Sequence, residues 1–419
     1  MSAHSTLTSK PVEACQVCGS KRLESILFVG YIPPVNTMLA MGSVAVEQPA
    51  YPLELLRCRD CTLVQIGLEV APEVLFPETY PYLSGTTRIL RDNFADLQRE
   101  SESLLGLTKD GLVIDVGSND GTLLAPFVKA GFRVLGIEPS QAGDVARKNG
   151  IDTLQAYFNL ATARAVRKKN GEAQLVTAAN VFAHIGGIHS VVDGILELLG
   201  PRGVFVSESH YLLDLVQTLQ YDTIYHEHLR HYSLVSLANL LGGHGLEVFH
   251  VKRIPTHGGS IRVYAARKGE RAVQASVAER LADEETAGLT SGAALRDFRS
   301  RVVRSKLELH ALLAPIRARG ERIYGIGAPS RASTLINYTG LDDGIVDAVM
   351  EVSSSHKLNR YIPGTRIPVL DEAKLFTDQP EYALLLSWHI ADELAKNLRA
   401  KGYRGKFIAP LPHPRFLSQ

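Results

Sequence analysis

Four cysteines near the amino terminus are spaced as metal ligands. Cys15 and Cys18 form one Cys-x-x-Cys pair, and Cys58 and Cys61 form a second. This spacing lets both thiolates of a pair turn inward, and two pairs supply the four sulfurs that structural zinc prefers. Four unconnected thiols or a redox pair are the alternatives, but the chain has no other cysteine. The pattern predicts a structural Zn²⁺ with no open coordination position.

A glycine-containing segment further along is typical of a nucleoside-binding loop. The β-branched run 111–116 indicates a buried parallel strand, and it leads into the turn 117–122 and then an apolar helix. Gly117 and Gly121 would let a ligand approach the backbone at the end of the strand. The alternative is a glycine turn that only packs the strand against the helix.

The residues around this turn favour one class of adenosine ligand. A dinucleotide loop needs Gly-x-Gly-x-x-Gly, but Asn119 replaces the middle glycine and Asp115 precedes the turn. The next strand, 133–137, ends at Glu138, whose carboxylate can accept hydrogen bonds from both ribose hydroxyls. S-adenosylmethionine carries a sulfonium cation in place of phosphates, so acidic residues suit it. We therefore predict that this cosubstrate is bound by Asp115, Gly117, Asn119, Gly121, Glu138 and Asn180.

A run of histidines and tyrosines carries the second candidate chemistry. Tyr225, Glu227 and His228 stand almost side by side, with His226 between the first two. His-x-His could hold a metal, but Glu227 separates the imidazoles and no third matching ligand lies near. A histidine whose tautomer is set by a carboxylate is the usual general base near neutral pH. A satisfied surface cluster is the alternative.

Two further segments add candidate residues. Tyr80 and Tyr82 lie among prolines that prevent a regular helix, which predicts a lid or a linker. Asn180 and His184 follow the strand expected over 174–181 and fall at the carboxyl edge of the sheet.

The elements that must position these residues alternate regularly. Strands and helices over about 111–264 predict a doubly wound α/β sheet with ligands at the carboxyl ends of its strands. A charged, amphipathic helix pair is expected over 272–319. A second α/β domain follows from 322, where Ser330 replaces the third glycine of a Gly-x-Gly loop and the helix amino end could still receive a phosphate.

Charge and hydropathy exclude some partners. The chain of 419 residues has 45 basic and 44 acidic residues and a formal net charge of +1, so it has no strong field for nucleic acid or an anionic bilayer. The first residues form no hydrophobic run, and no stretch reaches the roughly 18 apolar residues of a membrane span. We expect a cytoplasmic protein with no nucleic-acid or membrane partner, and its oligomeric state stays open, a monomer included.

The motifs, in chain order, resemble those of the sugar C-methyltransferases that make branched deoxysugars. The resemblance covers nearly the whole chain and is carried by the cysteine pairs, YPYLSG, VIDVGSNDG, GIEPS, ANVFAH, DTIYHEHLRHYS, HGGS, GIGAPSRASTLINY and YIPGTRIPV. It is strongest to the enzymes that methylate carbon 3 of a dTDP-linked 3-amino-4-keto-2,3,6-trideoxy sugar, the D-tetronitrose type. One departure is GAPSRAST, where the family more often has Ala-Lys-Gly-Asn.

The resemblance implies an organisation and a mechanism. It implies a zinc-binding module over 1–75, a methyl-donor domain over 76–266 and a C-terminal α/β domain over 267–419, with the sugar nucleotide held largely by the outer two. Carbon 3 of a 4-keto sugar is acidic, so the enzyme needs a base and an oxyanion donor. His228 would take the proton, and Glu227 would orient a histidine or bind the sugar amine. The residues left to stabilise the oxygen or position the ring are Tyr225, Tyr80, Tyr82 and His184.

Three other functions fit parts of the pattern. A small-molecule O- or N-methyltransferase with a structural zinc would need no carbon acid and no sugar nucleotide. A non-enzymatic zinc scaffold would keep the donor fold without binding S-adenosylmethionine. A nicotinamide dehydrogenase fits least, because neither glycine loop is complete.

Overall fold

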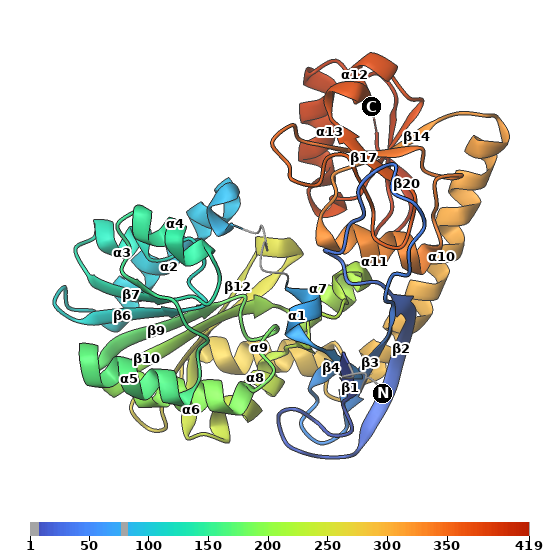
Figure 1. Cartoon of the computed structure of the whole chain (residues 1–419). Coiled ribbons are helices and arrows are strands. Elements are labelled where there is room, and N and C mark those ends of the chain that lie inside the picture. The colour runs from blue at the N-terminus through green and yellow to red at the C-terminus, as the bar shows by residue number, and fades with distance from the viewer. Residues whose placement is uncertain (1–7, 77–82, 419) are drawn as a thin grey trace, which may run out of the picture.

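The computed structural model describes residues 8–76 and 83–418. An amino-terminal module, a large α/β domain and a C-terminal α/β domain follow one another along the chain (Figure 1). Long helix α10 (Ala293–Ala318) runs along one side of the molecule from the module to the C-terminal domain. The expected α/β fold class, with a second α/β domain and a small amino-terminal module, is confirmed.

The amino-terminal module is built on an antiparallel sheet, and one strand of this sheet comes from the middle of the chain. Its strand order is β11-β4-β3-β2. The bounds are β2 (Leu23–Ile32), β3 (Tyr51–Cys58), β4 (Val64–Ile66) and β11 (Arg230–His231). A separate pair, β1 (Ser9–Pro11) with β5 (Leu68–Val70), and the short helix α1 (Pro72–Leu75) complete it. Since β11 begins two residues after His228, it extends the histidine run, and its hydrogen bonds to β4 join that run to the module.

The central sheet has seven strands in the order β12-β13-β10-β9-β6-β7-β8. The strand bounds are β6 (Leu112–Val116), β7 (Arg133–Ile137), β8 (Thr153–Leu154), β9 (Ala173–Ala179), β10 (Leu199–His210), β12 (Leu246–Ile254) and β13 (Ser260–Arg267). Strands β6 to β10 are parallel, and β13 is antiparallel to β10 and β12. All five residues of β6 are buried, as expected for a strand covered on both faces.

Helices cover both faces of this sheet. On one face, α2, α3 and α4 share a hydrophobic core with β6, and on the other face α5 and α6 pack together. The bounds are α2 (Arg88–Leu105), α3 (Ala125–Lys129), α4 (Ala142–Lys148), α5 (Leu160–Asn170), α6 (Ile188–Leu198), α7 (Leu212–Gln217) and α8 (Leu234–Gly242). The single-turn 3₁₀ helices are η1 (Ser84–Thr86), η2 (Tyr221–Thr223) and η3 (Thr256–Gly258).

The helix pair expected over 272–319 is confirmed as α9 (Ala275–Thr286) and α10. The buried side chains of α10 recur every three or four residues, so one stripe of the helix faces the protein. This stripe contacts α7 and β2, which makes α10 a brace between the module and the central domain.

The C-terminal domain is a second seven-stranded sheet with the order β16-β17-β15-β14-β18-β19-β20. Its strands are β14 (Ile323–Ile326), β15 (Ala348–Glu351), β16 (Arg360–Tyr361), β17 (Pro368–Asp371), β18 (Tyr382–Leu385), β19 (Lys406–Ala409) and β20 (Arg415–Phe416). Its helices are α11 (Ser330–Thr339), α12 (Ala373–Asp378), η4 (Trp388–Ile390) and α13 (Ala391–Ala400).

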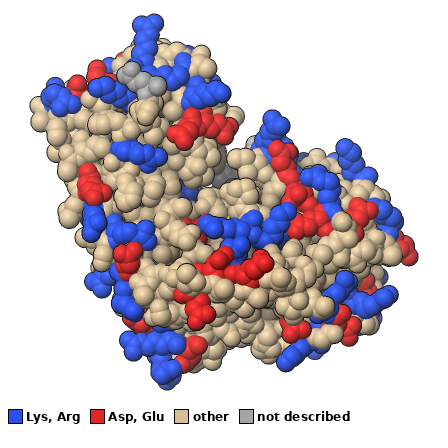
Figure 2. Space-filling model, turned by 180° about the vertical axis from the view of Figure 1, so that it is seen from behind, with Lys and Arg blue, Asp and Glu red and all other residues tan. Residues whose placement is uncertain are grey.

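Charges of both signs are interspersed on the face shown in Figure 2. This matches the formal net charge of +1. Within the described part of the chain, no helix is both long enough and apolar enough to cross a bilayer.

Candidate functional site

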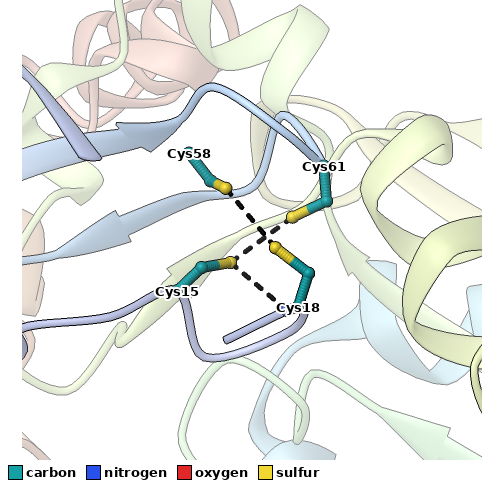
Figure 3. A group of neighbouring side chains, drawn as sticks. All are labelled: Cys15, Cys18, Cys58 and Cys61. Carbon is teal, nitrogen blue, oxygen red and sulfur yellow. Dashed lines mark hydrogen bonds between the residues drawn. The ribbon is translucent and has the colours of Figure 1, made fainter. Parts of the chain in front are cut away.

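The four cysteines converge as the spacing predicts. Their sulfurs point toward one another (Figure 3), and all four ligand atoms lie within 4.8 Å of one another. The Cys15 and Cys61 Sγ atoms are 3.3 Å apart, and those of Cys18 and Cys58 are 3.6 Å apart. Zn–S bonds of about 2.3 Å in a tetrahedron place sulfurs roughly 3.8 Å apart. The site therefore fits Zn²⁺ closely.

The backbone also stabilises thiolates at this site. The N–H group of Val17 points to the Sγ of Cys15 at 3.4 Å, and that of Asp60 points to the Sγ of Cys58 at the same distance. Gly19 adopts φ 72°, the left-handed conformation that closes the first knuckle at no steric cost. Backbone donors of this kind favour the charged thiolate that binds metal.

The first zinc knuckle holds the histidine run directly. Gln16, between the two cysteines of the pair, accepts a 2.8 Å hydrogen bond from Nη1 of Arg230, whose Nη2 donates to the Phe182 carbonyl at 3.0 Å. Arg230 and His231 form β11 and pair with Gln65 and Val64 of β4. The metal site is therefore mechanically coupled to the segment that carries His228.

The predicted donor loop lies at the carboxyl end of β6. Gly117, Asn119 and Gly121 all have positive φ, at 70°, 49° and 79°. A Cβ at Gly117 would lie 2.5 Å from the Val181 side chain, and one at Gly121 would lie 2.8 Å from Ile151. Both glycines are thus required by packing, and a close approach to a ligand remains a prediction for them.

Glu138 ends β7 and is buried beside this loop. Its Oε2 accepts the Asn119 N–H at 2.9 Å, and its Oε1 accepts the Ser140 N–H at 2.9 Å. Each carboxylate oxygen has a second lone pair available for a ribose hydroxyl. The arrangement therefore fits the adenosine part of S-adenosylmethionine.

Asp115 is buried at the end of β6. Its Oδ1 accepts a 2.6 Å hydrogen bond from the hydroxyl of Thr177. Burial, with a smaller contribution from the nearby carboxylates of Glu138 and Glu208, raises the pKa of Asp115 to about 8, and the Thr177 hydrogen bond acts in the opposite direction. The carboxyl is largely protonated at neutral pH in the free protein.

A cavity opens at the carboxyl ends of β9 and β10. Seven of its eight lining residues have polar side chains, and the lining consists of Asn180, Ala183, His184, Ser209, His210, His228, Arg230 and His231. Several buried polar atoms here have no partner in the part of the chain that the structure describes, namely Asn180 Oδ1, His184 Nδ1, Ser209 Oγ and His231 Nε2. An unpaired buried polar group costs about 1–3 kcal/mol. The cavity holds about 20 Å³, which is room for about one water-sized polar group that would satisfy these atoms.

His228 stands at the centre of an aromatic and imidazole cluster. Its ring centroid lies 4.1 Å from that of Tyr225, 4.9 Å from His184 and 5.2 Å from His210. Its Nδ1 is 2.7 Å from the carbonyl oxygen of Thr223. A carbonyl only accepts, so Nδ1 carries the proton and Nε2 has a free lone pair.

Burial keeps these imidazoles neutral. Desolvation holds the pKa of His228 well below its usual range, with a further lowering from His184 and His231. Burial also lowers the pKa of His184 to about 4. A neutral imidazole with a free Nε2 is the form of histidine that can accept a proton.

The expected partner of this histidine is corrected. A backbone carbonyl, and not a carboxylate, sets the tautomer of His228, because the 3₁₀ turn η2 leaves the Thr223 carbonyl free to accept. The Glu227 carboxylate instead accepts a 2.6 Å hydrogen bond from Asn36 of the amino-terminal module. His226 points elsewhere, with its Nε2 3.4 Å from the Pro52 carbonyl oxygen.

Tyr80 and Tyr82 lie outside the described residues. The described residues on either side of them contact both halves of the candidate site. The Phe76 ring lies 6.2 Å from that of His184, and the Ser84 N–H donates to Asn119 Oδ1 at 2.9 Å. A role for the two tyrosines remains a prediction.

The structure adds residues that sequence reasoning missed. Ser209 and His210 line the cavity because β10 extends to His210. His257, which belongs to the HGGS motif, places its ring centroid 5.1 Å from that of His210. A Ser-His pair directly after a buried strand was the available signal for the first two.

Three family models together match most of the chain. A model described as a putative zinc binding domain matches 15–76, a methyltransferase domain matches 88–251, and a C-methyltransferase C-terminal domain matches 255–412. C-methyltransferase NovU of Streptomyces niveus is 33% identical over 412 residues, which covers 98% of each chain.

Likeness to solved structures is confined to part of the chain. The PH0226 protein of Pyrococcus horikoshii OT3 is 15% identical, with a TM-score of 0.37, over 47% of this chain and 98% of that chain. Magnesium protoporphyrin IX methyltransferase of Synechocystis PCC 6803 is 16% identical, with a TM-score of 0.34, over 43% of this chain and 85% of that chain. The family models and the full-length relative therefore carry the functional comparison.

Proposed function

The chain belongs to the family of S-adenosylmethionine-dependent C-methyltransferases with an amino-terminal zinc-binding domain, and on that premise we propose its substrate. The proposed substrate is a dTDP-linked 3-amino-4-keto-2,3,6-trideoxy sugar, and the methyl group is added to its carbon 3. Family membership excludes the non-enzymatic scaffold and the dehydrogenase, and the C-methyltransferase relative favours carbon over oxygen or nitrogen as the acceptor.

The proposal rests mainly on the tautomer and the protonation state of His228. Its Nδ1 is committed to the Thr223 carbonyl, so the neutral ring has its Nε2 lone pair available beside the cavity. In the proposed reaction Nε2 takes the proton from carbon 3, and the electron pair of that C–H bond becomes the enolate. S-adenosylmethionine supplies the electrophilic methyl group.

The cavity and the donor loop lie at the same carboxyl edge of the central sheet. Glu138 follows β7 and Ser209 lies at the end of β10, and β7, β6, β9 and β10 are consecutive neighbours in the sheet. Neighbouring strands lie about 4.8 Å apart, so roughly 14 Å separates the two ends. This span suits an adenosine with its amino-acid arm followed by a sugar ring.

The other proposed roles follow from position. Tyr225 and His184 flank His228 and are proposed to hold the developing oxyanion, together with Tyr80 or Tyr82. Glu227, held by Asn36, is proposed to bind the sugar amine. The division into 1–75, 76–266 and 267–419 is proposed to place the sugar nucleotide between the outer domains.

The substrate is tested by incubating the protein with methyl-labelled S-adenosylmethionine and a panel of dTDP-keto sugars. We expect label on carbon 3 of a 3-amino-4-keto sugar, identified by carbon NMR of the product. Label on oxygen or nitrogen, or no transfer to any keto sugar, would contradict the proposal.

Glu138→Gln is expected to weaken S-adenosylmethionine binding at least about tenfold. The amide nitrogen cannot accept a hydrogen bond, so one backbone N–H and one ribose hydroxyl lose their acceptor. Calorimetric titration measures the affinity. Glu172→Gln, at an exposed ion pair on the same domain, is the matched control and should bind normally. Equal affinities for the two variants would exclude Glu138 from the donor site.

Affinity for S-adenosylmethionine is expected to rise with pH up to about 8, by up to tenfold per unit. Burial sets the pKa of Asp115 at about 8, and the bound cation favours the ionised carboxylate, so binding releases a proton below that pH. In the free protein the raised pKa stabilises the fold most below about pH 4, and this contribution is lost as pH rises through 8. Titrations between pH 6 and 9 check the trend; a pH dependence that persists in Asp115→Asn would contradict it.

A further inference from the structure

We propose that Arg331 and Trp388, both from the C-terminal domain, are positioning residues for the base His228. They act through Asp222 and Thr223, which precede His228 in the chain. The inference rests on the proposed function in one respect, the assignment of His228 as the base. The contacts that position His228 do not depend on this assignment.

The C-terminal domain binds the carboxylate of Asp222, six residues before His228. The Asp222 side chain is fully buried in η2. Arg331 Nε donates to Oδ2 and Nη2 donates to Oδ1, each at 2.7 Å, and the indole Nε1–H of Trp388 donates to Oδ2 at 2.7 Å. The guanidinium also lies 4.9 Å from the centroid of the Trp388 ring. Two elements of the C-terminal domain, α11 and η4, therefore fix one carboxylate of the central domain.

Thr223 transmits this position to the imidazole. It is the next residue after Asp222, and both its hydroxyl and its N–H point to the Gln220 carbonyl, at 2.8 Å and 3.0 Å. The peptide is thereby held in one orientation, with its own carbonyl 2.7 Å from His228 Nδ1. The path from Arg331 to His228 thus consists of one ion pair, one turn and one hydrogen bond.

The chemical consequence concerns the tautomer. If the Thr223 carbonyl moves away, Nδ1 loses its acceptor and the proton can reside on Nε2 instead. A ring protonated on Nε2 presents a donor where the reaction needs a lone pair. The contact between the C-terminal domain and Asp222 therefore favours the Nδ1-protonated tautomer of His228, which can act as a base. Proton abstraction is coupled in this way to the domain proposed to hold the sugar nucleotide.

Two variants test the inference at different strengths. Trp388→Phe keeps the aromatic ring and removes one hydrogen bond to Asp222, and Arg331→Lys keeps the charge and removes the bidentate fork. Arg317→Lys is the matched control, because its ion pair with Asp347, at 3.0 Å, belongs to the C-terminal domain and involves neither Asp222 nor the cavity. All are made in the full-length, zinc-loaded chain.

The decisive readout is the tautomer of His228, measured by nitrogen NMR on protein with labelled histidine and assigned by the signal lost in His228→Asn. We expect both test variants to move the ring toward the Nε2-protonated form, and turnover to fall at least about fivefold, with S-adenosylmethionine affinity within about twofold of normal. The control should keep the wild-type tautomer.

The outcomes separate the inference from the proposed function. An unchanged His228 tautomer in both Trp388→Phe and Arg331→Lys overturns the inference. A changed tautomer with full turnover upholds the positioning and removes His228 from the role of base.

Discussion

Replacing His228 with asparagine is expected to lower turnover at least about a hundredfold while affinity for S-adenosylmethionine stays near normal. Asparagine has no basic nitrogen, so the proton of carbon 3 loses its acceptor. Its side-chain amide can still donate a hydrogen bond, so the Thr223 carbonyl that now accepts from Nδ1 need not lose its partner. Turnover is measured with labelled donor, and donor affinity by calorimetry.

His226→Asn is the control for this variant. His226 belongs to the same run and is buried, but its ring lies against Tyr51 of the amino-terminal module. Its loss should leave most of the turnover. Full turnover in His228→Asn would exclude His228 as the base. Because the pKa of His228 lies well below its usual range, the wild-type base should also stay neutral, and competent, below pH 6.5.

Removal of zinc is expected to abolish turnover and to lower the thermal midpoint by at least about 10 °C. Structural zinc contributes on the order of 10 kcal/mol to the folding of small zinc domains, so the module should not keep its fold without it. The loss reaches the cavity because Gln16 holds Arg230 and β4 pairs with β11. Most of the donor-binding residues lie at the ends of β6 and β7, which are not paired with β11, so donor binding should survive.

Chelation and Cys58→Ser test this expectation together, with metal content followed by mass spectrometry. Ser25→Ala, on the exposed part of the same sheet, is the control and should keep metal, stability and turnover. A metal-free chain with full turnover would show that the cysteine cluster does not support the cavity.

Local sequence signals were sufficient for the regular elements. The strand expected at 133–137 has these bounds in the structure, and the strand expected at 111–116 begins one residue later, at 112. Both could be predicted because each is a short apolar run ended by a glycine or an acidic turn. The cysteine spacing predicted the metal cluster for a similar reason, since a Cys-x-x-Cys knuckle is a local geometry.

The residues that surround the histidines were harder to predict from the sequence. The sequence pointed to His228, but the acceptor that sets its tautomer is a backbone carbonyl, and every residue type has one. Arg331 and Asp222 stand 109 positions apart, so no local pattern relates them. The two-residue strand β11 is likewise too short to be seen as a strand without its partner β4.

The sequence by itself determined the metal ligands, the donor-loop segment and the run that holds the candidate base, because each depends on residue type and short-range spacing. Only the tertiary structure decided which atoms of these segments meet. The cavity at the ends of β9 and β10, the tautomer of His228 and the grip of the C-terminal domain on Asp222 arise from contacts between distant segments. Such contacts depend on how whole sheets and helices pack, and their hydrogen-bond directions are fixed only when that packing is complete.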